Sequence, residues 1–338
     1  MFLFRRFASH CMLVLLGLGL FTTSASLAKQ KPYDSIVVFG GSLSDPGNAF
    51  VVLSNPASFG FDESCGPLTP MNVPPYDTLD DLYIPDGVYA MGGHHVSNGA
   101  TWVEQLARNN ALAGSTRPAL RNDGPQARNY AVGGARANDY PCRFNLSNQL
   151  GAYLANPSVL SPETLVVFEM GGNDLRDALV ALPADPTPII GGAIGNIGSA
   201  IVTLYSMGAR QFLLMNVPDI GKSPAVQILD GMYPGLAAAA TGLTVAFNQQ
   251  LLALQGQLNF LYPGMDVRIF DAYTLLNAIV ADPADYGIEV TDVPCITPNI
   301  APYKCTRPDS YLFWDGLHPT RAVHKIMANG AAEVLFTP

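Results

Sequence analysis

Four short apolar runs constrain the fold of this chain more than any other feature. They occupy residues 35–39, 164–170, 211–216 and 266–270. The runs are apolar throughout and do not alternate with polar residues, a pattern typical of parallel strands that are covered on both faces. Stretches with helical spacing separate them, so the sequence predicts an α/β fold with a central, mostly parallel sheet.

The helical stretches are predicted at 101–113, 243–258 and 319–335, the last beginning with a proline at its first position. A fourth segment, 186–209, contains no charged residue, which also fits a membrane span. Its five glycines and its asparagine, serine and threonine residues favour a helix that is buried against the sheet.

The first residues have the features of an export signal. Arginines at 5–6 precede an apolar stretch at 11–22, which is too short for a stable membrane span. Ser26 and Ala28 supply small residues at the two positions that a signal peptidase reads. We therefore expect residues 1–28 to be a signal peptide that is removed after Ala28, and the protein to be secreted or periplasmic.

The remaining chain, 29–338, is expected to form one domain with irregular insertions at about 50–93 and 282–307. Long irregular segments in a compact domain are usually lids or binding loops, and the alternative is surface decoration. Removal of the signal takes away two arginines and no acid, which moves the formal net charge from -9 to -11. This acidity argues against nucleic acid or an anionic membrane as the main partner.

Four cysteines remain after the signal, namely Cys65, Cys142, Cys295 and Cys305. Export makes pairing plausible, and four cysteines allow three connectivities. We favour Cys295–Cys305, which closes a short proline-rich loop, and this leaves Cys65–Cys142. The alternative is free buried thiols, and no spacing resembles a zinc site.

Ser42 follows the first apolar run on a glycine-rich turn. In open α/β sheets, ligands bind outside the carboxyl ends of the strands, so Ser42 is a candidate nucleophile. The alternative is that Ser42 only caps the next helix. His318 is the candidate base, and Asp315 lies three residues earlier, close enough to orient the imidazole and to stabilise its charged form.

An acyl-transfer site also needs donors for the developing oxyanion. The backbone amide of Ser42, one amide of the glycine pair 133–134 and the side chain of Asn173 could supply them. Each piece has a plainer interpretation, since the glycines could form only a turn and Asn173 or Asp174 could cap a helix. Four such pieces in this order favour catalysis.

With these motifs in place, the chain resembles the GDSL, or SGNH, serine hydrolase superfamily, and its secreted lipase/esterase branch in particular. The first block of that branch reads close to F-G-D-S-L-S-D-x-G-N and corresponds to residues 39–48 here. The four residues that name the family fall on Ser42, Gly134 (with Gly133 as the fallback), Asn173 and His318.

The likeness runs from about Ser35 to Leu335, and the Asp-x-x-His block falls on Asp315 and His318. It implies a flavodoxin-like, three-layer α/β/α sandwich, with catalytic Ser42, Asp315 and His318. The oxyanion hole would be formed by Ser42, Gly134 and Asn173, and no metal or organic cofactor is implied.

Gly41 departs from the pattern, because the family usually has aspartate there. Glycine loosens the nucleophile turn and removes a local hydrogen-bond acceptor. We therefore predict that the nucleophile turn is less preorganised but that activity is not lost. A Gly41→Asp variant with lower turnover on every ester tested would contradict this prediction. The other histidines are poorer candidates for the base. His94 and His95 lie in an irregular segment and are expected at the surface or on the substrate side, and His324 is expected on the final helix.

The expected activity is hydrolysis of carboxylic esters, on a small-molecule or lipid substrate and with transient contact to a lipid surface. The apolar and aromatic residues of 50–93 favour an acyl-binding groove there. The alternatives are an acyltransferase that uses an alcohol acceptor, a carbohydrate acetylesterase and, from another class, a catalytically silent binding module. The sequence does not give the oligomeric state.

Overall fold

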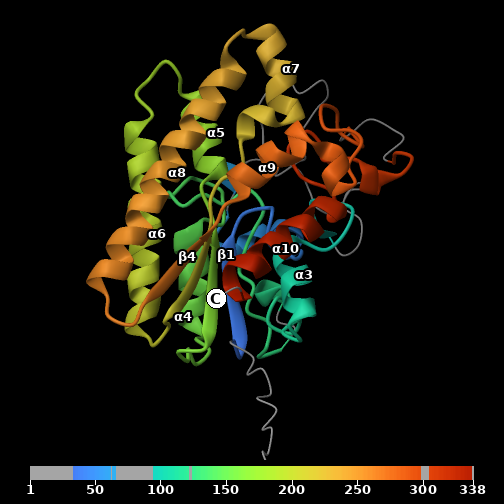
Figure 1. The fold of residues 1–338 in the computed structure, drawn as a ribbon. Coiled ribbons are helices and arrows are strands. Elements are labelled where there is room, and N and C mark those ends of the chain that lie inside the picture. Colours follow the sequence, from blue (N-terminus) through green and yellow to red (C-terminus); the bar gives the residue numbers. More distant parts are fainter. Residues whose placement is uncertain (1–32, 62, 66–93, 122–123, 298–303, 337–338) are drawn as a thin grey trace, which may run out of the picture. The chain divides into compact units, whose positions relative to one another are not determined.

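The computed structural model describes residues 33–61, 63–65, 94–121, 124–297 and 304–336. The predicted signal peptide lies outside these residues. The described residues from Tyr33 onwards belong to one compact unit (Figure 1).

The four apolar runs form one parallel sheet, in the order β1-β2-β3-β4. The strands are β1 (Ser35–Gly40), β2 (Thr164–Glu169), β3 (Gln211–Met215) and β4 (Asp266–Phe270). The predicted α/β class and the position of every strand are therefore confirmed. Successive strands are neighbours, so all four carboxyl ends meet at one edge of the sheet.

The α-helices are α1 (Asn48–Ser54), α3 (Trp102–Asn109), α4 (Leu146–Ala155), α5 (Gly172–Val180), α6 (Thr187–Ser206), α7 (Pro224–Met232), α8 (Leu236–Leu261), α9 (Ala272–Ala281) and α10 (Arg321–Phe336). Helix α8 begins before the predicted residue 243, because Ala237 to Ala240 continue it. Helix α10 begins after the predicted start, because Pro319 pairs with Phe313 in an antiparallel bridge.

Helices cover both faces of the sheet, which gives the three layers (Figure 1). Alternate residues of each strand point to opposite faces. Val37 and Phe39 of β1 pack with α4, α5, α6 and α8, whereas Ile36 and Val38 pack with α3, α9 and α10. Both faces are therefore buried, which is the physical reason for the apolar runs of β1, β2 and β3. The edge strand β4 is only partly buried, and it carries Asp266 and Arg268.

A fifth extended segment continues the sheet beyond β1. The Tyr130 amide donates to the carbonyl of Val38 at 2.8 Å, and the Val132 amide donates to that of Gly40 at 3.0 Å. Asn129 also forms a parallel bridge with Val38. This pairing brings the glycines at 133–134 to the same sheet edge as the end of β1.

Helix α6 lies on the α5 and α8 side of the sheet, as expected for the uncharged segment. Among the described residues it is the helix long and apolar enough to cross a membrane by length and composition, with 39% of its most apolar window buried. Its buried residues are Ile190, Ala193, Ile197, Gly198, Ala200, Ile201 and Leu204. One face of α6 therefore packs against the protein.

Both favoured disulfides are present, Cys65–Cys142 and Cys295–Cys305. Each lies partly in a segment predicted to be irregular. The first such segment nevertheless starts as helix, since α1 extends to Ser54. Residues 66–93 and 298–303 lie outside the described part of the chain.

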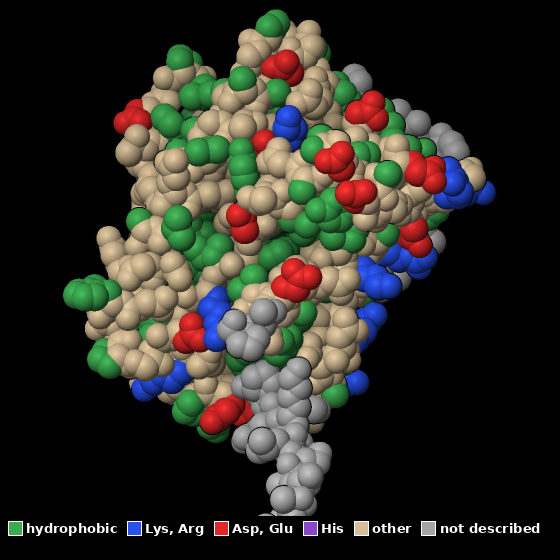
Figure 2. All heavy atoms as spheres, in the orientation of Figure 1, with side chains coloured by type: hydrophobic (Ala, Val, Ile, Leu, Met, Phe, Trp, Pro, Cys, Tyr) green, Lys and Arg blue, Asp and Glu red, His purple; other side chains and the backbone are tan. Residues whose placement is uncertain are grey.

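Charge is distributed unevenly on the face shown in Figure 2. Acidic side chains are spread over its upper part, and basic side chains gather along its right-hand and lower edges. This pattern follows the excess of acids in the sequence.

Candidate active site

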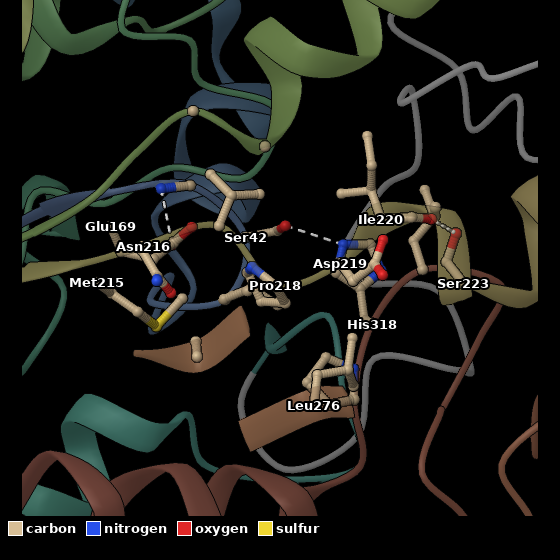
Figure 3. A pocket seen from close by; sticks show the side chains of 18 of the residues that line it. Ser42, Glu169, Met215, Asn216, Pro218, Asp219, Ile220, Ser223, Leu276 and His318 are labelled. Carbon is tan, nitrogen blue, oxygen red and sulfur yellow. Dashed lines mark hydrogen bonds between the residues drawn. The ribbon is translucent and has the colours of Figure 1, made fainter. Parts of the chain in front are cut away.

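Three side chains predicted from the sequence meet in direct contact at the carboxyl edge of the sheet. The Ser42 Oγ lies 2.9 Å from the Nε2 of His318 (Figure 3). The Nδ1 of His318 lies 2.9 Å from both carboxylate oxygens of Asp315. Asp315 and His318 are buried, with 1% and 5% exposure. This is the arrangement of a nucleophile, a base and a group that orients the base.

Asp315 shapes its own loop as well as the imidazole. Its Oδ1 accepts the amides of Leu317 at 2.8 Å and His318 at 2.7 Å. The Trp314 amide donates to the carbonyl of His318 at 2.7 Å, which closes the turn. The relation between Asp315 and His318 therefore arises almost entirely within five residues.

The segment at 97–99 braces this loop from outside. The Ser97 hydroxyl donates to the carbonyl of Pro319 at 2.8 Å, and the Asn98 Oδ1 accepts the amide of Arg321. This segment, which precedes α3, thus holds the end of the loop that carries His318.

The nucleophile turn is held by residues far away in the sequence. Gln149 of α4 bonds both the amide and the carbonyl of Gly40, each at 2.9 Å. The next amide, that of Gly41, donates to the Oε2 of Glu169 at 3.0 Å. Neither partner was identified from the sequence. For Glu169 a signal was available, because an acid ends an otherwise apolar strand.

Asp45 joins this turn to the glycine pair. Its carboxylate accepts the amides of Gly47, Asn48 and Ala49 at the start of α1. It also accepts the amide of Gly133 at 2.7 Å. Burial raises the pKa of Asp45 to about 6, against the lowering effect of these hydrogen bonds.

The contact with Asp45 helps to decide which glycine amide could donate a hydrogen bond to the oxyanion. The Gly133 N–H is already directed at Asp45, so it is not available to a substrate. Gly134 follows at φ 79°, a conformation that favours glycine, and its carbonyl accepts Arg136 at 2.7 Å. These contacts favour Gly134 over the fallback Gly133.

Asn173 lies in the first turn of α5 and lines the cavity beside Ser42. One N–H of its amide donates to the carbonyl of Ala135 at 2.9 Å. Gly171, two residues before Asn173, has φ 117°, and a Cβ there would lie 2.3 Å from the ring of Phe247. Glycine is therefore required for the turn that brings Asn173 to the site.

Asp174 does not cap α5, contrary to the expectation. Its buried carboxylate accepts the amides of Ala137 at 2.9 Å and Asn138 at 3.0 Å. Burial raises its pKa to about 6. Asp174 therefore ties the chain that follows the glycine pair to α5.

A cavity of about 150 Å³ opens beside Ser42 and His318, and most of its wall is apolar. The apolar residues that contribute to this wall include Met215, Ala272, Leu275, Leu276, Ile279, Phe313, Val323 and Met327. The described parts of 50–93 and 282–307 contribute no residue to it. β3, α9, α10 and the loop before α10 thus supply much of the apolar surface next to the candidate nucleophile, and α5, α7 and the segment after β3 add to it.

The remaining histidines lie elsewhere. His95 is buried, with its Nε2 2.8 Å from Glu104, so the expectation of a surface or substrate-side residue is wrong for it. His94 stacks on Phe50, with ring centroids 3.7 Å apart. His324 lies on α10 as expected and accepts the Trp102 amide at 3.2 Å, and burial lowers its pKa to about 3.

Comparison with known proteins gives a consistent result. The sequence profile of the family described as "GDSL-like Lipase/Acylhydrolase" matches residues 36–331. The GDSL esterase/lipase EXL2 of Arabidopsis thaliana is 25% identical in an alignment of 361 positions. This alignment covers 91% of this chain and 90% of the plant protein. The thermolabile hemolysin of Vibrio parahaemolyticus is 24% identical over 258 residues, which cover 71% of this chain and 55% of the hemolysin.

A crystal structure from Parabacteroides merdae, of a protein called a GDSL-like lipase, aligns with 89% of this chain and 95% of its own. The identity is 13% and the TM-score is 0.42, so this alignment adds nothing to the fold described above. The sequence profile, in contrast, spans nearly all the described residues. The chain therefore belongs to the GDSL-like lipase/acylhydrolase family and is a serine ester hydrolase.

Proposed function

We propose that this chain is a secreted carboxylic-ester hydrolase that works through a covalent acyl-enzyme on Ser42. One observation carries the proposal, namely the contact of 2.9 Å between the Ser42 Oγ and a His318 ring that Asp315 holds from its other side. Such a contact is the signature of an activated serine nucleophile.

In the first half-reaction, the Ser42 Oγ attacks the acyl carbonyl while the Nε2 of His318 takes the hydroxyl proton. The same proton then passes to the leaving alcohol as the ester C–O bond breaks. In the second half-reaction, His318 takes a proton from the water that attacks the acyl-enzyme. The bond between the acyl carbon and the Ser42 Oγ then breaks, the proton passes from His318 back to the Ser42 Oγ, and the carboxylic acid is released. Asp315 holds the imidazole in the required tautomer and stabilises its charged form.

The negative charge on the carbonyl oxygen needs donors that are already in position. We assign this role to the amides of Ser42 and Gly134 and to the side chain of Asn173. Each donor of this kind is worth about 10²–10³ in rate. Gly134 is preferred because Asp45 occupies the Gly133 amide.

The acyl group would lie along the apolar wall formed by α9 and α10. An apolar cavity of about 150 Å³ accommodates a molecule the size of benzene, or roughly six carbon atoms. We therefore propose short to medium acyl chains as the best substrates, in preference to acetyl or palmitoyl groups.

The experiment compares hydrolysis of p-nitrophenyl esters, from acetyl to palmitoyl, by the wild type and Ser42→Ala. We expect activity to rise towards the hexanoyl ester, to fall for longer chains and to vanish in the variant. Retained activity in folded Ser42→Ala would overturn the serine mechanism. A flat or rising profile to palmitoyl would overturn the chain-length assignment alone. A new ester formed when an alcohol is added would show transfer instead of hydrolysis.

Export belongs to the same proposal, with cleavage of the signal after Ala28. The two disulfides support it, because such bonds persist in oxidising compartments. Sequencing of the protein recovered outside the cytoplasm should give Lys29 as the first residue. Recovery of all the protein inside the cytoplasm with Met1 intact would contradict this part.

A further inference from the structure

Glu169 is a buried acid that the proposed chemistry leaves without a task. It ends β2, in register with Gly40 of β1 and Met215 of β3, and it is 7% exposed. Its carboxyl group lines the same cavity as Ser42 and His318. In Figure 3 it lies on the opposite side of Ser42 from His318.

The contacts of Glu169 are with the nucleophile turn. The Gly41 amide is shared between the Oε2 and the backbone carbonyl of Glu169, each at 3.0 Å. Glu169 is also hydrogen-bonded to the side chain and the amide of Ser44. The Ser44 amide in turn donates to the carbonyl of Gly41 at 3.2 Å. Glu169, Gly41 and Ser44 thus form a closed ring of contacts around the backbone of Ser42.

The carboxyl group also occupies the space that a side chain at position 41 would enter. A Cβ built on Gly41 would lie 3.6 Å and 3.7 Å from the two carboxyl oxygens of Glu169, and 3.5 Å from the Nδ2 of Asn173. The acceptor that Gly41 cannot supply is therefore present one strand away. This corrects the expectation that the turn lacks a local acceptor.

Such a position is costly for an acid. Burial, with a smaller contribution from the charge of Asp45, raises the pKa of Glu169 to about 8, and the bonds to Gly41 and Ser44 only partly offset this rise. Burial of this kind disfavours the charged form of a carboxyl group, so it does not by itself indicate a stabilising role. A neutral carboxyl group, however, can hold Gly41 without placing a negative charge beside a developing oxyanion.

We propose that Glu169 is a positioning residue for the oxyanion hole, which acts by fixing the peptide on each side of Ser42 so that the Ser42 amide faces the substrate carbonyl. This inference rests on the proposed function. It predicts that Glu169 affects the rate of the chemical step and not substrate affinity, because it holds a group whose bond strengthens in the transition state.

The test uses Glu169→Ala, Glu169→Gln, Gly41→Asp and the double variant Gly41→Asp/Glu169→Ala, with kcat and KM measured on one p-nitrophenyl ester. In Glu169→Ala we expect kcat to fall about tenfold with KM within about twofold, since one misaligned donor loses part of its effect. Glu169→Gln keeps the acceptor and the neutral charge, so its kcat should stay within about threefold of the wild type.

The reciprocal exchange separates positioning from simple packing. Gly41→Asp alone should lower kcat, which revises the prediction made from the sequence, because the new carboxyl group would lie against that of Glu169. The double variant should recover activity relative to Glu169→Ala, because the new acid takes over the place of the old one. A double variant no better than Glu169→Ala, or a Glu169→Ala variant that changes only KM, would overturn the proposal.

If Glu169→Ala does not fold, the proposal is tested by the pH dependence of kcat in Glu169→Gln. The other titratable or charged groups around Glu169 are Asp45 beneath the turn and Arg176, Asp219 and His318 on the cavity wall, and all stay unchanged in this variant. Wild-type kcat should decline above about pH 8 and that of Glu169→Gln should not. Identical profiles would contradict the proposal. Ser42→Ala is the control, because its loss of activity alone tests the proposed function.

Discussion

The two sides of the active site are built in different ways. On the His318 side, Asp315 finds its partners within three residues, namely the amides of Leu317 and His318 and the imidazole itself. On the Ser42 side, the turn is held by Gln149 and Glu169, which are more than one hundred residues away. A local unit can form with few tertiary contacts, whereas the nucleophile turn is correct only when the sheet and its neighbours are in place.

This difference predicts where mutations will damage chemistry and where they will damage assembly. Changes at Asp315 should reduce the rate in a protein that still folds. Changes beneath Ser42 should affect the rate and the stability together.

Asp315→Asn should have the largest effect. The amide no longer selects the required imidazole tautomer, so kcat should fall about 10⁴-fold at neutral pH. The matched control is Asp309→Asn, which changes a half-exposed acid in the same region that pairs with Arg321. We expect the control to stay within about twofold of the wild type. A similar loss in both variants would show that the region is merely fragile.

Asn173→Ala should lower kcat by about 10²–10³ while KM changes little, because the amide binds the oxyanion more strongly than the ground-state carbonyl. Asn156→Ala, at an exposed position after α4, is the control and should leave both constants unchanged. A KM effect without a kcat effect would place Asn173 in substrate binding instead.

Asp45→Asn should disturb both rate and stability. The new NH₂ group would face amides that now donate to the carboxylate, those of Ala49 and Gly133. We expect the free energy of unfolding to fall by about 3 kcal/mol and kcat to fall about tenfold. Asp185→Asn, at an exposed turn, should leave the denaturation midpoint unmoved. An unchanged free energy of unfolding in Asp45→Asn would contradict the idea that the Ser42 turn, unlike the His318 loop, depends on distant contacts.

The smallest effect should appear in the pH dependence of stability. The pKa of Glu169 rises from 4.5 to about 8 on folding, through burial. Its protonated form therefore favours folding below pH 4.5, and this contribution is lost as the pH rises through about 8. Glu169→Gln has no carboxyl group to titrate and does not lose stability in this way. The difference between its melting temperature and that of the wild type should therefore increase by about 5 °C between pH 5 and pH 9. Parallel melting curves at both pH values would contradict the assignment of this titration to Glu169.

The same contrast explains what could be predicted from the sequence. The strands and the contact between Asp315 and His318 depend on local pattern and short spacing, and both were predicted. The meeting of Ser42 with His318 required the additional resemblance to a family. In the case of Glu169, an acid at the end of an apolar strand was visible, but its partner on β1 depends on the register of the sheet.

Other differences also have long-range causes. The apolar wall beside Ser42 gathers residues of α9 and α10 that carry no shared motif, so the sequence pointed to residues 50–93 instead. Asp174 lies in the first turn of α5, where an acid could bond the helix's own amides, yet its carboxylate accepts the amides of Ala137 and Asn138 because the fold brings that loop to it. His95 lies in a segment that looked irregular, and its burial follows from its pairing with Glu104.

The proposed acyl-enzyme on Ser42 can be tested by finding the atom that carries the acyl group. Brief reaction of the folded protein with a p-nitrophenyl ester, followed by acid quenching and peptide mass analysis, should give one acyl group per chain on the peptide that contains Ser42. The adduct should be absent in Ser42→Ala. An acyl group on a different residue in the wild type, or turnover in Ser42→Ala at the wild-type rate, would contradict the account.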